Sequence, residues 1–208
     1  MNAHPVTCPN CGYGFEGLRK STRMFDCPSC GTTLFREADA LAPLGAHGEM
    51  HETPMLIGMG DTVLVGTNKF DVLGHLRFDY GRGTWDEFWC ENRSGRGAWI
   101  SVDEGDVVLQ EPMPEDAVRK GLQGELRLGA GIRIDGEVYE ITELDRAACI
   151  AFRGQLPEKI TLGETHGFVN ATGPDGRLIS GEFWDGGGAW FEGEWLDPFE
   201  LRIERLHG

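Results

Sequence analysis

The chain has 208 residues, 40% of them hydrophobic, and a formal net charge of −15. This length allows one ordinary domain plus a small module, or two small domains. The negative charge repels phosphate backbones and so disfavours general nucleic-acid binding. No stretch approaches the roughly 18 consecutive apolar residues that a membrane-spanning helix needs, so we expect no membrane span.

The first feature along the chain is a pair of CxxC motifs, CPNCG and CPSCG, with fifteen residues between them. This spacing is typical of a zinc site. The four candidate ligands are Cys8, Cys11, Cys27 and Cys30. Gly12 and Gly31 follow the two pairs, where a turn often requires positive φ. Four thiolates close the coordination shell of zinc and leave no open position for a substrate.

We therefore predict that residues 1–36 form a zinc ribbon around one structural Zn²⁺. Two disulfides, unrelated thiols, or iron in place of zinc are the alternatives. Thiolate ligands need a reducing compartment. The N-terminus also lacks the basic segment followed by an apolar segment that marks a secretory signal. We expect a cytoplasmic protein.

Residues 37–55 contain two prolines and no sustained hydrophobic period, which predicts a linker with at most one helical turn at Glu37–Leu41. His47 and His51 lie four residues apart and would share one face of a helix. Neighbouring glycines and a proline disfavour a helix there, so we expect no metal site at these histidines.

Strand signals dominate from residue 56 onward. Residues 63–78 alternate around a Gly-Thr-Asn turn, and Asp135-Gly136 is a two-residue hairpin signal. The best helix signal in this part of the chain is the short segment Glu115–Leu122. The pattern predicts an all-β fold.

The strand pattern also repeats. A shift of 69 residues aligns Val63 with Ile132 and Phe70 with Tyr139. Further on, EFW at Glu87–Trp89 recurs at Glu182–Trp184, and GAW at Gly97–Trp99 recurs at Gly188–Trp190.

This order predicts two duplicated small antiparallel β-barrel or sheet units packed together, preceded by the ribbon. The first unit would span residues 56–110 and the second residues 125–208, with a connector at residues 111–124. Chance similarity between the halves is the alternative.

Several segments resemble the bacterial family catalogued as domain of unknown function 4178. They are, in order, GDTVLVGTNKFDVLGHLRF, WDEFW, GAWISVDEGDVVL, YEITELDRAACIAFRGQLP and DGRLISGEFWDGGGAWFEGEWLDPFEL. The resemblance covers about residues 56–206, and an N-terminal CPxCG ribbon ahead of the domain is also similar to members of this family. It implies no activity, substrate or catalytic residue.

All six tryptophans lie in the repeated β-units. Large aromatic side chains suit pleated surfaces, so one interpretation is that they fill the core. The other is an aromatic pocket between the units that holds an amine or polyamine cation with the help of carboxylates. The candidate pocket residues are Trp85, Glu87, Trp89, Trp99, Glu182, Trp184 and Trp190.

Catalysis would need an acid/base pair, and Glu87, Glu182 and His166 are the candidates. Glutamates that flank strands are usually solvated, and a single histidine is usually incidental. We expect Cys90 and Cys149 to be buried, inert thiols. The sequence contains no phosphate loop, dinucleotide fingerprint or Ser-His-Asp order.

We therefore expect a non-catalytic binding or adaptor protein. The ribbon would dock one partner, and the acidic β-body would bind a protein or a cationic ligand such as a polyamine. The alternative is a small hydrolase or transferase that uses the paired carboxylates in a cleft between the β-units.

Overall fold

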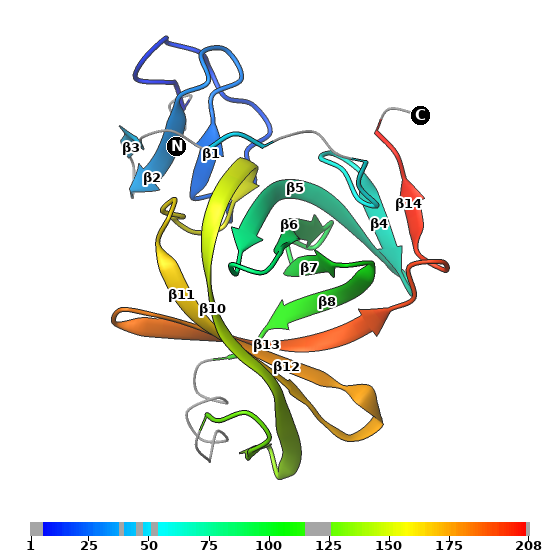
Figure 1. The fold of residues 1–208 in the computed structure, drawn as a ribbon. Helices are drawn as coiled ribbons and strands as arrows, with labels where there is room; N and C mark the ends of the chain where they lie inside the picture. The colour runs from blue at the N-terminus through cyan, green and yellow to red at the C-terminus, as the bar shows by residue number, and fades with distance from the viewer. Residues whose placement is uncertain (1–5, 38–39, 45–47, 51–53, 115–125, 207–208) are drawn as a thin grey trace.

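The structure is a computed structural model that describes residues 6–37, 40–44, 48–50, 54–114 and 126–206. These residues form one 14-stranded antiparallel sheet, a single 3-10 turn and no α-helix (Figure 1). The all-β prediction is confirmed. The helix signal at Glu115–Leu122 lies outside the described residues.

The strands differ widely in length, from three residues to twenty. The ribbon and the predicted linker after it contain β1 (Met24–Asp26), β2 (Thr33–Glu37) and β3 (Ala40–Pro43). The first half of the remaining chain contains β4 (Thr62–Val65), β5 (Asn68–Asp79), β6 (Thr84–Asn92), β7 (Gly97–Asp103) and β8 (Asp106–Pro112). The second half contains β9 (Gly131–Ile134), β10 (Glu137–Leu156), β11 (Thr165–Thr172), η1 (Pro174–Gly176), β12 (Leu178–Trp184), β13 (Gly187–Leu196) and β14 (Arg202–Glu204).

The sheet closes on itself because β5 pairs with β10 as well as with β4 and β6. Eight strands form the resulting barrel, in the order β5-β6-β7-β8-β13-β12-β11-β10. Strands β5 to β8 form one meander and β10 to β13 form a second. The two predicted units are thus joined edge to edge by backbone hydrogen bonds into a single barrel.

Two glycines allow β5 and β10 to approach closely where the barrel closes. A Cβ atom on Gly74 would lie 2.3 Å from the carbonyl oxygen of Gln155. Gly154 has a φ of +82°, and a Cβ atom there would lie 2.4 Å from the carbonyl oxygen of Leu73. A side chain at either position would clash with backbone, so closure requires glycine at both.

The expected repeat agrees with the structure in one hairpin and departs from it in another. Val63 pairs with Phe70 across β4 and β5, and Ile132 pairs with Tyr139 in the same register across β9 and β10. The EFW and GAW segments, however, lie on the second and third strands of the first meander and on the third and fourth strands of the second. The duplication stays a prediction.

Side-chain alternation along the strands creates three apolar clusters in and around the barrel, and a fourth cluster lies in the ribbon. The barrel interior holds one cluster, to which Leu76, Trp89, Trp99 and Phe191 belong. Strands β4 and β14 extend the sheet beside the first meander, where Val63, Phe88 and Ile100 share a second cluster. Strand β9 contributes to the third cluster, which includes Ile132, Val169 and Trp190.

The ribbon is part of the same sheet. In Figure 1 its blue strands lie at one end of the long strand β10, and β1 pairs with β10 through Met24 and Phe25. Strand β3 pairs with β2 along Leu34–Glu37. The predicted helical turn at Glu37–Leu41 is wrong, because Glu37 ends β2 and Ala40 begins β3.

Candidate zinc centre and acidic cavity

The four predicted cysteine ligands converge. Their sulfur atoms all lie within 4.8 Å of one another, with 3.8 Å between Cys8 and Cys30 and 3.7 Å between Cys11 and Cys27. Four sulfurs at about 2.3 Å from a tetrahedral zinc ion lie about 3.8 Å apart. The cluster therefore fits one zinc ion, bound by four thiolates.

Two matching turns bring the sulfurs to this point. The backbone N–H of Gly12 donates to the carbonyl oxygen of Cys8 over 2.9 Å, and that of Gly31 donates to Cys27 over 2.8 Å. Both glycines have positive φ, +77° and +70°, as the motif predicted. With four thiolates bound, zinc would cross-link the two turns and keep no open position for chemistry.

The loop between the two turns anchors the ribbon to the barrel. Arg19 Nη2 lies 2.7 Å from Asp71 Oδ2 on β5, and the Ser21 hydroxyl bonds to the carboxylate of Glu91 on β6. The Thr22 hydroxyl donates to Gln155 Oε1 on β10 over 2.7 Å. The ribbon therefore contacts three strands of the barrel.

The barrel interior also contains a cavity of about 240 Å³, which we call the barrel cavity. Its acidic lining residues are Glu87, Asp103, Asp106, Glu143 and Glu182. Its aromatic lining residues are Tyr80, Trp85, Phe168 and Trp195. None of the described residues that line it is lysine, arginine or histidine. The cavity is thus a negatively charged chamber with aromatic walls.

A second space of about 290 Å³, the side cavity, involves residues 158–161 and 164 of the segment between β10 and β11. Its other lining residues include Leu76, Phe78, Trp99, His166 and Trp184. Glu87 and Glu182 line the side cavity as well as the barrel cavity. These two carboxylates therefore stand between the two spaces.

The environment of this pair disfavours its ionised form. Glu87 is 7% exposed, and the Trp85 indole N–H donates to its Oε1 over 3.0 Å. Burial, with a further contribution from the charge of Glu158, raises the pKa of Glu87 to about 7. Burial and the charges of Glu87 and Glu158 raise the pKa of Glu182 well above its ordinary value. Both shifts follow from moving like charges into a low-dielectric site.

Five of the seven candidate pocket residues line one or both cavities. Trp85, Glu87 and Glu182 line the barrel cavity, and Trp99 and Trp184 line the side cavity.

Trp89 and Trp190 line neither cavity. Trp89 packs against Trp99 in the interior core with 5.1 Å between ring centroids. Trp190 packs against Phe183 in the third apolar cluster.

His166 joins Glu87 and Glu182 in the side cavity, so the three candidate acid/base residues do converge. The four-cysteine cluster is the single group of potential metal ligands found in the described part of the chain. His47 and His51 lie outside that part. Cys90 and Cys149 are buried, as expected, and burial raises the pKa of Cys149 to about 12.

Sequence reasoning missed much of the cavity lining. Ser101 and Asp103 on β7 alternate with the apolar Ile100 and Val102, a pattern that indicates a polar inward face only once the barrel is known. Over the intervening strand β13, the hydroxyl of Ser180 on β12 donates to the side-chain oxygen of Gln110 on β8.

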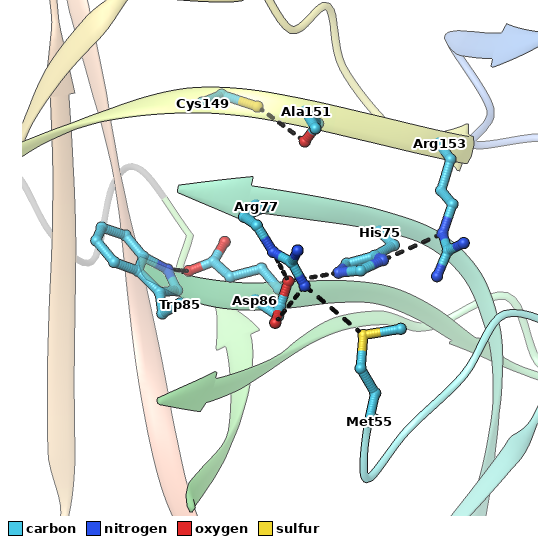
Figure 2. Close-up of polar contacts among 9 residues, drawn as sticks. Met55, His75, Arg77, Trp85, Asp86, Cys149, Ala151 and Arg153 are labelled. Atoms are coloured by element: carbon cyan, nitrogen blue, oxygen red, sulfur yellow. Dashed lines mark hydrogen bonds and ion pairs between the residues drawn. The ribbon is translucent and has the colours of Figure 1, made fainter. Parts of the chain in front are cut away.

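A second polar cluster, also missed, surrounds His75 on β5. Its Nε2 lies 2.7 Å from Asp86 Oδ1, and its Nδ1 accepts from Arg153 Nε over 3.2 Å (Figure 2). Arg77 donates to the same carboxylate through Nε and Nη2.

The His75 side chain is completely buried, and burial lowers its pKa. Both ring nitrogens are engaged, so His75 is a neutral imidazole that donates from Nε2. The cluster holds β5, β6 and β10 together.

The family comparison agrees with the resemblance noted above. A family model described as "Domain of unknown function (DUF4178)" matches residues 58–198. No curated protein and no solved structure gives a match. Within the described residues, no helix has the length and apolar character needed to cross a membrane.

Proposed function

The chain belongs to the DUF4178 family, and from that premise we propose that it is a binding protein whose barrel cavity holds a small organic cation. The observation that carries the proposal is the lining of this cavity. Five carboxylates and four aromatic rings line it, and none of the described lining residues has a basic side chain.

Carboxylates with aromatic faces are the usual means of holding an amine or quaternary ammonium group. The aromatic rings of the cavity wall pack against one another. Trp85 lies 5.2 Å from Phe168 and 5.6 Å from Tyr80, measured between ring centroids. The Trp85 N–H also donates a hydrogen bond to the Glu87 carboxylate and so holds this group beside the aromatic rings. A cation in this space would gain both ring and carboxylate contacts.

In this proposal the ribbon has a structural role and does not bind the cation. Zinc held by four thiolates has no open coordination position for a ligand. An adaptor role, in which a second protein binds the acidic surface, is part of the same proposal. The need for thiolate ligands favours a reducing compartment such as the cytoplasm.

Calorimetric titration tests the proposal, with spermidine as the polycationic probe and 1,8-octanediol as an uncharged control of similar length. At pH 8 the Glu87 carboxylate is mostly ionised, since its pKa is about 7. We expect spermidine to bind and the diol not to bind. Absence of heat at millimolar spermidine in low salt would end the cation proposal.

Variants distinguish the cavity from the general negative charge of the surface. Glu87→Gln and Glu182→Gln should each weaken binding about tenfold, equivalent to about 1.4 kcal/mol. Asp185→Asn makes the same change in net charge on an exposed residue of the β12–β13 turn, outside both cavities. Equal weakening by all three variants would place the probe on the surface.

A small hydrolase or transferase is a second candidate function, favoured by the convergence of Glu87, Glu182 and His166 in the side cavity. A carboxyl group with a pKa near 7 is suited to general acid/base work. The test is turnover of p-nitrophenyl esters, phosphates and glycosides at pH 6–8. Turnover that Glu87→Gln and His166→Ala both abolish would support this function, and unchanged turnover would indicate a contaminant.

A further inference from the structure

Glu87 and Glu182 come from strands on different meanders, yet they line the same two spaces. Glu87 lies on β6 and Glu182 on β12, with β7, β8 and β13 between them in the ring. Both side chains line the barrel cavity and the side cavity. A ligand in the barrel cavity would reach the two carboxylates from that cavity. It would leave their faces toward the side cavity uncovered.

No cation neutralises this pair within the described residues. The Trp85 N–H is the one hydrogen-bond donor that reaches the Glu87 carboxylate, and the Glu182 carboxylate has no hydrogen bond or ion pair in the described part of the chain. The titratable groups that face them across the barrel cavity are Tyr80, Asp103, Asp106 and Glu143. Those that face them across the side cavity are Glu158, Lys159, Glu164 and His166.

Carboxylates therefore outnumber the basic groups on both sides. Lys159 is the one lysine or arginine among the described residues that line the two cavities, and its ammonium lies over the Phe35 ring, 5.8 Å from the centroid. Two carboxylates that share a poorly solvated site cannot both ionise at low cost, so they share a proton. The raised pKa values of Glu87 and Glu182 agree with this reasoning.

We propose that Glu87 and Glu182 hold one proton between them in the empty cavity, and that the cationic group of the ligand displaces this proton to solvent on binding. The inference rests on the proposed function, and it adds that binding is an exchange of one cation for one proton. The carboxyl O–H bond breaks, the proton passes to buffer, and the ligand cation takes its place beside two carboxylates. The side cavity gives the proton an exit that the ligand does not block.

Such an exchange makes the affinity depend on pH in a defined way. Below pH 7, each unit of acidification should weaken binding about tenfold, because about one proton must be released per ligand. The dependence should level off at the higher pH at which the shared proton is lost. Spermidine amines remain protonated through this range, as amines ordinarily titrate near pH 10.

The test is titration of spermidine into the full-length zinc-loaded protein at pH 6.5, in phosphate and in MOPS, two buffers with different heats of ionisation. We expect the observed heats to differ by the amount that corresponds to release of about one proton. The Glu87→Gln variant should still bind spermidine, but more weakly. Its binding heat should be the same in the two buffers. Asp106→Asn removes an exposed carboxylate at the same cavity and should weaken binding while the buffer difference persists.

The outcomes separate this inference from the function on which it rests. No heat in either buffer, repeated at pH 8, would overturn the proposed function. Binding with equal heats in both buffers, or a buffer difference that survives in Glu87→Gln, would overturn the proton exchange alone. Near-ultraviolet circular dichroism of each variant, compared with the wild type, verifies that the barrel is folded.

Discussion

Met24 of the ribbon and Leu156 of β10 are register partners, and both side chains are completely buried in the interior core of the barrel. Met24 lies only three residues before Cys27, a member of the four-cysteine cluster. The ribbon thus contributes a core side chain to the barrel, and the zinc centre is linked to the barrel by this short stretch of chain.

Removal of zinc should therefore destabilise the barrel as well as the ribbon. All six tryptophans lie between residues 85 and 195, outside the ribbon, so tryptophan fluorescence reports on the barrel. We expect chelation of zinc, or a Cys27→Ser substitution, to lower the tryptophan-detected unfolding temperature. An unchanged transition on complete zinc removal would mean that the ribbon folds independently of the barrel.

Truncation of Met24 should have a large cost. Met24→Ala leaves a cavity beside Leu156, and such changes usually cost about 2–5 kcal/mol. Urea denaturation would measure the loss. Phe199→Ala is the control, because that side chain is 97% exposed and its truncation should change the free energy of unfolding little. Similar losses in both variants would contradict the burial of Met24.

The stability of the ligand-free protein should depend on Glu87 in a pH-specific way. Burial raises the pKa of this carboxyl from an ordinary 4.5 to about 7, so the folded state binds the proton more tightly than the unfolded state. The resulting stabilisation is complete below pH 4.5 and is lost as pH rises through 7. The loss is on the order of 3 kcal/mol by pH 8.

Glu87→Gln removes this dependence. The variant should gain stability relative to the wild type as pH rises from 5 to 8, measured by urea denaturation followed by circular dichroism. His75 acts in the opposite direction, because burial lowers its pKa and its stabilisation is lost on acidification below 6.5. The difference between variant and wild type cancels this histidine contribution. Parallel stability curves would show that Glu87 titrates normally.

The cluster around His75 should be structural. Asp86→Asn removes the charge that accepts hydrogen bonds from His75 and Arg77, which should cost about 2–3 kcal/mol. Ligand affinity per folded molecule should not change, since Asp86 lines neither cavity. Asp185→Asn is the matched control. A selective loss of binding in Asp86→Asn would assign this cluster to the functional site instead.

Some features followed directly from the sequence because they depend on short-range chemistry. Each CxxC turn, followed by a glycine, aims its two sulfurs at one point, and the structure brings all four sulfurs within 4.8 Å of one another. The alternation from residue 56 onward predicted strands for the same reason, because the period of two is local.

Other features depended on which strands became neighbours. Glu87 and Glu182 were candidates by sequence, but their shared place between two cavities arises from the closure of β5 on β10 at Gly74 and Gly154. Trp190 has the same sequence context as Trp99, yet the two rings lie in different clusters because their strands hold different positions in the meanders.

The sequence by itself determined the four-cysteine cluster, the all-β class and the family, since each rests on residue spacing within short segments. Only the tertiary structure decided the single closed barrel, the insertion of Met24 into its core and the acidic cavity. These features require contacts between residues far apart in the chain. Which face of a strand points into the barrel is decided only when the sheet closes.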